Sequence, residues 1–330
     1  MDSFTPENLF SVNYLTLIPQ NPGDDLSERF KTMRSILTLF LSFLLIPEIF
    51  AAEIQVPEGK TAGERFCVTI RGVEYPFRWC PPGTFLMGSP ESEPLRKPDE
   101  TQHSVTISRG FWLLETEVSQ PMWESVMGSN PSNWKGADLP VEMLCQHDCR
   151  EFCEKISRIS GLKITLPTES QWEYAARAGT ATPYSFGSVF DGTQGNSDGT
   201  QPYGTETPGK YLARTAPIYS YAPNPWGFYN MHGNVREWVL DVYGPYPTEP
   251  VTDPTGAAEG AHIVDRGGGW LGHTKYCRSA YRVAHDPGYK NSRLGMRIVL
   301  EVPDSQSVVP GPGAEHHMGP CQECRFSTLP

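Results

Sequence analysis

The pattern of apolar and polar positions predicts short strands near the start of the folded region. Short strands are predicted over Arg71 to Trp79 and Gly83 to Met87, around the turn Cys80-Pro81-Pro82. Apolar and polar residues alternate over His103 to Ile107, which predicts another strand. No repeat of fixed period occurs between residues 60 and 300, and no stretch there is long enough to act as a linker. We therefore expect one domain.

Two helices are predicted from caps and apolar spacing. Ser119 is a good N-cap, Pro121 suits the second helical position, and Gly128 stops the helix after Met127. A second helix is expected from about Leu144 to Ser160, before Gly161. Its apolar face is formed by Cys149, Phe152, Cys153 and Ile156.

A third helix has the sharpest start signal. Thr168 can cap it while Gln171 reaches back as the partner in a capping box, and the helix continues to Gly179. From Thr180 to Thr215 the chain is rich in Gly, Thr, Ser, Asp and Pro, which in a compact domain predicts a long ordered loop. A bound metal ion is one candidate for holding that loop.

The stretch from Trp226 to Arg297 is dense in glycine, asparagine and tryptophan. This composition predicts irregular structure rather than an ordinary helix or a regular sheet. We expect a loop that a cation stabilises, beside a binding groove, and the thiol of Cys277 is the obvious reactive group nearby.

Composition supports a loop-rich globular protein. The chain of 330 residues is 38% hydrophobic and contains 31 glycines and 31 prolines, more than average, which fits an irregular fold. The formal net charge of −11 argues against nucleic acid or an anionic membrane as the main partner.

The N-terminal region carries the pattern of an export signal. Met33-Arg34 precedes the uncharged run Ile36 to Ile46, and the small pair Ala51-Ala52 follows. We expect residues 1–32 to be a non-native or disordered leader, residues 33–52 a signal peptide, and the mature protein to be secreted, periplasmic or in the cell envelope. A retained membrane anchor is the alternative.

Eight cysteines in an exported protein permit disulfides. Cys67 with Cys80 is a plausible hairpin disulfide. The series Cys145, Cys149 and Cys153 lines one helix face and is expected to be core or disulfide rather than zinc ligands. The segment His316-His317-Met318 with Cys321 and Cys324 is read as part of a flexible tail, with metal binding as the alternative.

A series of motifs in a fixed order resembles the formylglycine-generating enzyme family, also called sulfatase-modifying factors. The motifs are Gly83-Thr84-Phe85-Leu86-Met87-Gly88, Glu117-Val118-Ser119, Asn130-Pro131-Ser132, Leu139-Pro140-Val141-Glu142, Leu166-Pro167-Thr168-Glu169, Trp172-Glu173-Tyr174-Ala175-Ala176-Arg177, Gly233-Asn234-Val235-Arg236-Glu237-Trp238, Arg266-Gly267-Gly268 and Gly295-Met296-Arg297. The resemblance covers residues 80–301, after a strand region at 53–79 and before a tail at 302–330. It implies an α+β, irregular C-type-lectin-like variant fold.

The resemblance also implies a calcium site. Asn230, Gly233, Val235 and Glu237 match the ligand positions, and they offer the hard oxygens that Ca²⁺ prefers. From the residues alone, the alternative is a Gly-Asn turn with a buried glutamate paired to an arginine.

A second calcium site in the family matches Asn196 and Ser197. Lys210 falls where an aspartate ligand is expected, so this site would need the loop to use Asp198 or Glu206 instead.

The family's reaction oxidises a sulfatase cysteine to formylglycine with molecular oxygen and Cu(I) held by two thiolates, and soft thiolates suit Cu(I). Cys277 matches the second thiol, but Gly272 stands at the first position, and Gly269 replaces the expected serine. His273 and Tyr276 remain at matching positions. A standard copper centre is therefore not expected.

Three roles are possible for Cys277. It can be a buried structural cysteine, a reactive thiol beside His273, or part of a His/Cys metal site with His232 or His285.

Three functions follow from these features. The chain can be an accessory module whose groove, lined by Trp226, Trp238, Trp270, Tyr276 and Arg282, holds an unfolded sulfatase, another extended peptide or a glycan. It can be an oxidoreductase that makes formylglycine with Cys277. It can also be a structural cell-envelope protein on a lectin-like scaffold.

Overall fold

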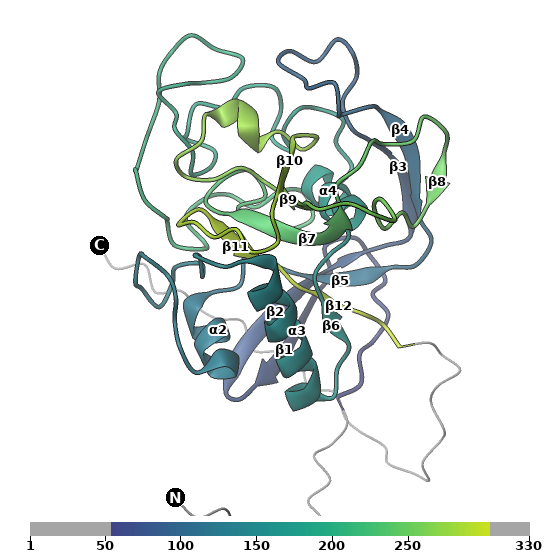
Figure 1. The fold of residues 1–330 in the computed structure, drawn as a ribbon, viewed down its shortest axis with the longest axis vertical. Helices are drawn as coiled ribbons and strands as arrows, with labels where there is room; N and C mark the ends of the chain where they lie inside the picture. Colours follow the sequence, from purple (N-terminus) through teal and green to yellow (C-terminus); the bar gives the residue numbers. More distant parts are fainter. Residues whose placement is uncertain (1–53, 304–330) are drawn as a thin grey trace, which may run out of the picture. The chain divides into compact units, whose positions relative to one another are not determined.

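The first sheet joins both ends of the described region, residues 54–303 of this computed structural model (Figure 1). Its strand order is β1-β2-β5-β12-β6, and every neighbouring pair is antiparallel. The strands are β1 (Arg65–Ile70), β2 (Val73–Cys80), β5 (Phe111–Leu114), β6 (Ile164–Thr165) and β12 (Val299–Leu300). Because β12 lies between β5 and β6, the end of the folded region completes the sheet that its beginning starts.

The hairpin of β1 and β2 differs from the prediction. The predicted strand from Arg71 begins instead at Val73, because Arg71 and Gly72 form the hairpin turn with φ values of 50° and 77°. Cys67 lies opposite Pro76, whereas Cys80 lies four residues further along β2, beyond the residues paired with β1 and opposite Phe111 of β5. The predicted disulfide between Cys67 and Cys80 is therefore wrong.

Helices α2 (Gln120–Met127) and α3 (Gln146–Ser160) confirm the cap and spacing signals. The Ser119 side chain accepts a hydrogen bond from Met122 N, and Gly128 takes the left-handed conformation with φ of 74°. In α3 the predicted face, with Cys149 and Cys153, is buried in the larger core. The α3 helix starts two residues later than predicted, with Cys145 as its N-cap.

Helix α4 (Glu169–Arg177) has the predicted capping box. Thr168 accepts from Gln171 N, and the Gln171 side chain accepts from Thr168 N at 2.9 Å. The helix contacts β3, β7 and β9, so it lies between two sheets (Figure 1).

A second sheet occupies the stretch that was predicted to be irregular. Its order is β10-β9-β7-β11, with β7 and β11 parallel. The strands are β7 (Arg236–Val242), β9 (Ile263–Arg266), β10 (Arg282–His285) and β11 (Leu294–Met296). The prediction of irregular structure missed these four strands, because glycines such as Gly233, Gly267 and Gly268 at positive φ lie between them. The strands themselves carry apolar residues such as Val239 and Val264.

The third sheet confirms two predicted strands. It contains β3 (Gly83–Met87) paired with β4 (His103–Ile107), and β4 pairs in parallel with β8 (Val251–Thr252). The remaining element is a 3-10 helix, η3 (Thr274–Cys277), in the loop that contains the candidate cysteine.

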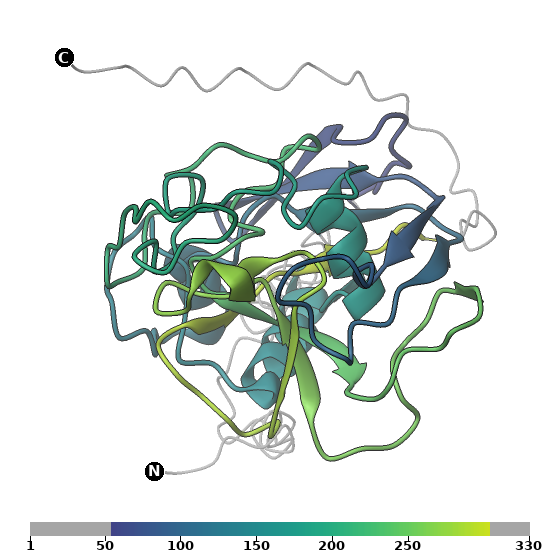
Figure 2. The ribbon, with the colours of Figure 1, turned by 90° about the horizontal axis from the view of Figure 1, so that it is seen from above.

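The residues 180–215 form a loop without a named helix or strand, as predicted (Figure 2). It has a small aromatic core of its own, in which Tyr184, Phe190 and Tyr203 pack with Cys277. With its mixed sheets and few helices, the described region is loop-rich, as the glycine and proline content predicts.

The predicted leader, signal peptide and the tail with Cys321 and Cys324 fall largely outside the described residues. Between residues 54 and 303, none of the helices has the length and apolarity needed to cross a membrane.

Candidate functional site

Cys277 lies at the end of η3 and is completely buried. Its thiol lies 3.5 Å from the Ser197 hydroxyl, and the backbone of Gly268 covers it so closely that a Cβ there would collide with the sulfur. Burial raises the pKa of the Cys277 thiol to about 11. The geometry favours a structural cysteine over a reactive thiolate.

Gly272 lies on the same loop, five residues earlier. Its carbonyl accepts hydrogen bonds from the Ser197 hydroxyl at 2.6 Å and from Asp198 N at 2.9 Å, which ties η3 to the long loop. A glycine supplies no thiolate, so the residues present do not fit a two-thiolate Cu(I) centre. A Cβ at this position would meet Gly269 O at 3.4 Å, so a side chain has room to be added.

The histidines do not gather around Cys277. His273 stacks on Tyr276 with ring centroids 5.6 Å apart, and His285 pairs with Asp265 on the neighbouring strand. His232 meets only the backbone of Cys277, through its Nδ1 at 2.8 Å from the carbonyl oxygen. Within residues 54–303, no three His, Cys, Asp or Glu side chains converge as metal ligands, so the His/Cys metal interpretation has no geometric support.

Glu237, the predicted carboxylate ligand of the first calcium site, is held by an arginine. Arg297 donates to both of its oxygens, and Trp172 Nε1 donates to Oε2 at 2.7 Å. Glu237 and Arg297 are both fully buried. This is the arrangement of the non-calcium alternative, a buried glutamate paired to an arginine.

Asn230 retains an oxygen that suits a cation. Its side-chain nitrogen donates to Glu117 Oε2 and to Ile218 O, each at 2.9 Å, whereas its buried Oδ1 has no hydrogen-bond partner. Leaving a buried carbonyl oxygen unpaired is costly, so this atom is a candidate ligand for a hard cation.

Glu117 was missed as a site residue, although its motif was noted. Its two oxygens accept hydrogen bonds from Asn230 and Asn234, and it is completely buried near Glu237. Burial raises its pKa to about 7. The buried Glu117 links the two asparagines of the candidate calcium loop.

The predicted second calcium site has lost most of its donors to other contacts. The Ser197 hydroxyl donates to Gly272 O, and the Asp198 carboxylate accepts from Thr200. Lys210 contributes its backbone carbonyl to Gly199 N. Among the buried side-chain atoms of this predicted set that the structure describes, Oδ1 of Asn196 stays without a partner.

The predicted groove residues do not line one surface. Trp238 is fully buried in the larger core and donates to Leu144 O, so its assignment to a groove is wrong. Trp270 is 8% exposed and packs edge-on against Trp134. Trp226 is half-buried against Tyr174. These aromatic residues were predicted to line a groove, but tertiary packing buries Trp238 and Trp270 and half-buries Trp226.

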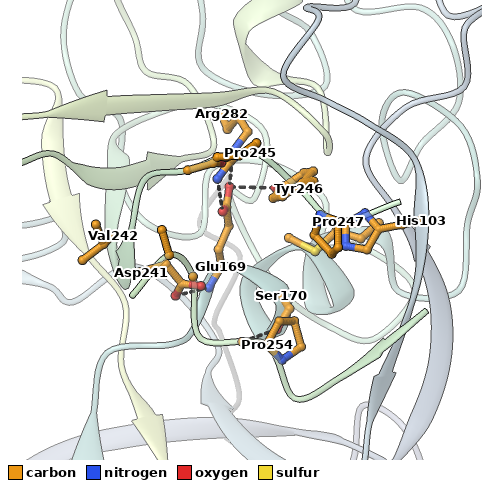
Figure 3. A pocket seen from close by; sticks show the side chains of 14 residues that line it. His103, Glu169, Ser170, Asp241, Val242, Pro245, Tyr246, Pro247, Pro254 and Arg282 are labelled. Carbon is orange, nitrogen blue, oxygen red and sulfur yellow. Dashed lines mark hydrogen bonds and ion pairs between the residues drawn. The ribbon is translucent and has the colours of Figure 1, made fainter. Parts of the chain in front are cut away.

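Arg282 lines a pocket together with Glu169, Asp241 and Tyr246 (Figure 3). The pocket has an empty volume of about 440 Å³, part of it open to solvent. There Arg282 donates to both oxygens of Glu169, and Tyr246 OH donates to Glu169 at 2.8 Å. The guanidinium also stacks on the Tyr246 ring at 3.9 Å. These contacts make Arg282 a structural ion-pair partner rather than a free cation.

Asp241 lies in the wall of the same pocket. Its Oδ2 accepts from Glu169 N at 2.7 Å at the start of α4, which favours a negative charge at a helix N-terminus. Burial and the nearby Glu169 carboxylate nevertheless raise its pKa to about 7.

Comparison with known proteins identifies the family. Residues 77–302 match the sulfatase-modifying factor enzyme 1-like domain. A formylglycine-generating enzyme of Streptomyces coelicolor is 33% identical over 215 residues, which span 59% of this chain and 66% of that enzyme. The match therefore spans a little under two thirds of the enzyme's length.

Two further relatives broaden the comparison. The chaperone protein LppX of Paenibacillus barcinonensis is 26% identical over 62% of this chain and 84% of its own. The structure of PvdO from Pseudomonas aeruginosa aligns with a TM-score of 0.61 at 24% identity, covering 74% of this chain and all of PvdO. Since the family match covers more than half of the sequence, the chain belongs to the sulfatase-modifying factor family.

Proposed function

We propose that this chain is an exported sulfatase-modifying factor relative, with a C-type-lectin-like variant fold, that lacks copper oxidase activity and serves as an accessory module for an extended peptide. The single observation that carries this proposal is the combination of Gly272 at the first thiol position with a buried Cys277 at the second. One thiol is missing, and the other is covered by the Gly268 backbone with a raised pKa. The chain therefore lacks the two thiolates that the family's copper chemistry requires.

An accessory function is supported by a relative whose name describes binding rather than oxidation. LppX is named a chaperone protein, and its match covers most of its own length. The family relation favours a cysteine-containing sulfatase segment as the partner. A glycan remains an outcome that the same binding assay can detect.

The direct test is an activity assay with the described domain. The protein is incubated with Cu(I), oxygen and a peptide that contains Cys-x-Pro-x-Arg, and mass spectrometry is used to detect conversion of the cysteine to formylglycine. We expect binding of the peptide without conversion. Conversion by the wild-type protein would overturn the assignment as a non-oxidase.

Restoring the thiol provides the matched comparison. Gly272→Cys is expected to fold, because a Cβ at this position meets its nearest neighbour at 3.4 Å. Gly272→Ala is the control that fills the same space without a thiol. If only Gly272→Cys binds Cu(I), measured by copper retention after gel filtration, the absent thiol explains the absent centre.

A calcium ion is part of the same proposal. The unpartnered Asn230 Oδ1 supports it, and the backbone carbonyls of Gly233 and Val235 would complete the hard oxygen set. The pairing of Glu237 with Arg297 opposes it, because the arginine already neutralises that carboxylate. When bound, the ion would stabilise the loop before β7, and it takes no part in oxidation.

A further inference from the structure

A serine and a histidine meet at the wall of a second open pocket. Ser185 lies in the long loop at residues 180–215, and His232 lies in the loop before β7. The Ser185 Oγ and His232 Nε2 atoms are 3.0 Å apart. Both residues line a pocket of about 660 Å³ empty volume, part of it open to solvent.

The backbone fixes the protonation state of the imidazole. Because the Cys277 carbonyl can only accept, His232 Nδ1 carries the proton and donates it at 2.8 Å. The Ser185 backbone N–H donates to Nε2 at 3.0 Å, so Nε2 is the unprotonated nitrogen. The hydroxyl of Ser185 therefore donates a hydrogen bond to Nε2. The lone pairs of the Ser185 oxygen are left for other contacts.

Aromatic rings enclose this imidazole. His232 is 4% exposed, and Tyr184 and Phe186 pack edge-on against its ring at 5.5 Å and 5.2 Å. This packing holds the ring in the orientation that directs Nε2 at the Ser185 hydroxyl. The arrangement resembles that of a serine hydrolase: Ser185 is the nucleophile and His232 is the base. The Cys277 carbonyl orients the imidazole, as the carboxylate of the third residue does in a catalytic triad.

The pocket itself indicates the substrate class. Its residues include no Asp, Glu, Lys or Arg, and its apolar side chains are Phe186, Ala222, Pro223, Phe228 and Met231. Gln194 lines the same pocket, and its side-chain amide can donate to a developing oxyanion. A neutral ester with a short apolar acyl group fits this lining.

We propose that Ser185 and His232 form a serine esterase site, separate from the cysteine position of the family. Ser185 Oγ attacks the acyl carbonyl carbon and passes its proton to His232 Nε2. The ester C–O bond breaks, and the leaving alcohol takes the proton from Nε2. Water then attacks the acyl-serine, His232 again moves the proton, and the acid is released with Ser185 restored.

The backbone N–H of Ser185 shares the same Nε2 lone pair. This sharing weakens the hydrogen bond from the Ser185 hydroxyl to Nε2. The reaction is therefore expected to be slow and to favour esters with good leaving groups, because Nε2 is less available to accept the hydroxyl proton.

The experiment uses the purified protein with p-nitrophenyl butyrate and, in parallel, a fluorophosphonate probe. The wild type should hydrolyse the ester above the buffer rate and carry the probe on Ser185, identified by peptide mass spectrometry. Ser185→Ala should lower kcat/KM by about a hundredfold or more, the lower end of acid-base effects, and should abolish labelling.

Ser188→Ala is the matched control, since Ser188 is an exposed serine three residues further along the same loop. It should leave hydrolysis and labelling unchanged. Thermal unfolding of each variant shows whether it is folded. The proposal is overturned if folded Ser185→Ala hydrolyses the ester like the wild type, or if the wild type is neither active nor labelled.

Discussion

At the scale of single residues, the chemical role of each side chain depends on the groups that bury it or bind it. Cys277 looks reactive in the sequence, yet the structure buries it beneath Gly268 and beside Ser197. Glu237 looks like a metal ligand, yet Arg297 donates to both of its oxygens. The motifs drew attention to these residues, but their contacts come from segments far away in the chain.

Gly268 and Gly272 give a paired test of the cysteine pocket. Gly268→Ala should destabilise the protein by roughly 1–3 kcal/mol, because φ is 71° and the added Cβ would collide with Cys277. Gly272→Ala should change stability little, since the nearest atom to its Cβ is 3.4 Å away. Chemical denaturation measures both. Equal stability of the two variants would contradict the description of Gly268 as a lid on the sulfur.

Asp241 should make stability depend on pH. Its folded pKa, about 7, lies above the ordinary value of 3.8, so the folded state keeps a proton that the unfolded state has released. Stability from this group is present below pH 3.8 and is lost as the pH rises through 7.

Asp241→Asn removes this titration while it keeps an acceptor for Glu169 N. The melting temperature of the variant relative to wild type should increase from pH 4 to pH 8, by at least about 1 kcal/mol or roughly 2–4 °C. Thermal unfolding at several pH values measures the difference. A difference that stays constant with pH would show that Asp241 is ionised throughout.

At the scale of elements, helices were predicted better than strands. The ends of each helix are marked by residues near it in the sequence, such as Ser119 and Gly128 for α2 and Thr168 with Gln171 for α4. The structure confirms these caps. Strand β5, with all four residues buried, shows no alternation, and strand β6 has only two residues. Such short strands depend on partners elsewhere, so a local pattern cannot identify them.

The cap of α4 can be tested directly. Thr168→Ala removes the acceptor for Gln171 N and should cost about 1 kcal/mol. Thr168→Ser keeps the hydroxyl and should cost clearly less. Both values come from denaturant unfolding, and a loss of the same size in the two variants would show that the methyl group matters rather than the capping bond.

At the scale of the whole molecule, two sheets depend on contacts between distant segments. Strand β12 pairs with β5 and β6, and β11 pairs with β7 in parallel. Arg297 lies in the chain between β11 and β12, and Glu237 lies in β7. Their ion pair therefore joins residues that are 60 positions apart in the sequence. The loop with Asn230 precedes β7, so a cation bound there would act on the same assembly.

Calcium is therefore expected to act on global stability. If Ca²⁺ binds at Asn230, saturating Ca²⁺ should raise the melting temperature by several degrees over the value in EDTA, because a ligand at 100 times its Kd adds about 2.7 kcal/mol. Mg²⁺ should have a smaller effect, since it prefers a stricter octahedral geometry. Asn230→Ala should abolish the calcium-dependent shift. Identical melting in Ca²⁺ and EDTA would remove calcium from the proposal.

The sequence by itself determined the family, the three helices, the β3 and β4 strands and the missing thiol at Gly272. All of these depend on neighbouring residues or on the order of motifs. Only the tertiary structure decided that Glu237 pairs with Arg297, that Trp238 lies in the core and that Ser185 meets His232. Burial and pairing are set by long-range contacts, and the free energy of a buried charge or thiol depends on those contacts rather than on its neighbours in the chain.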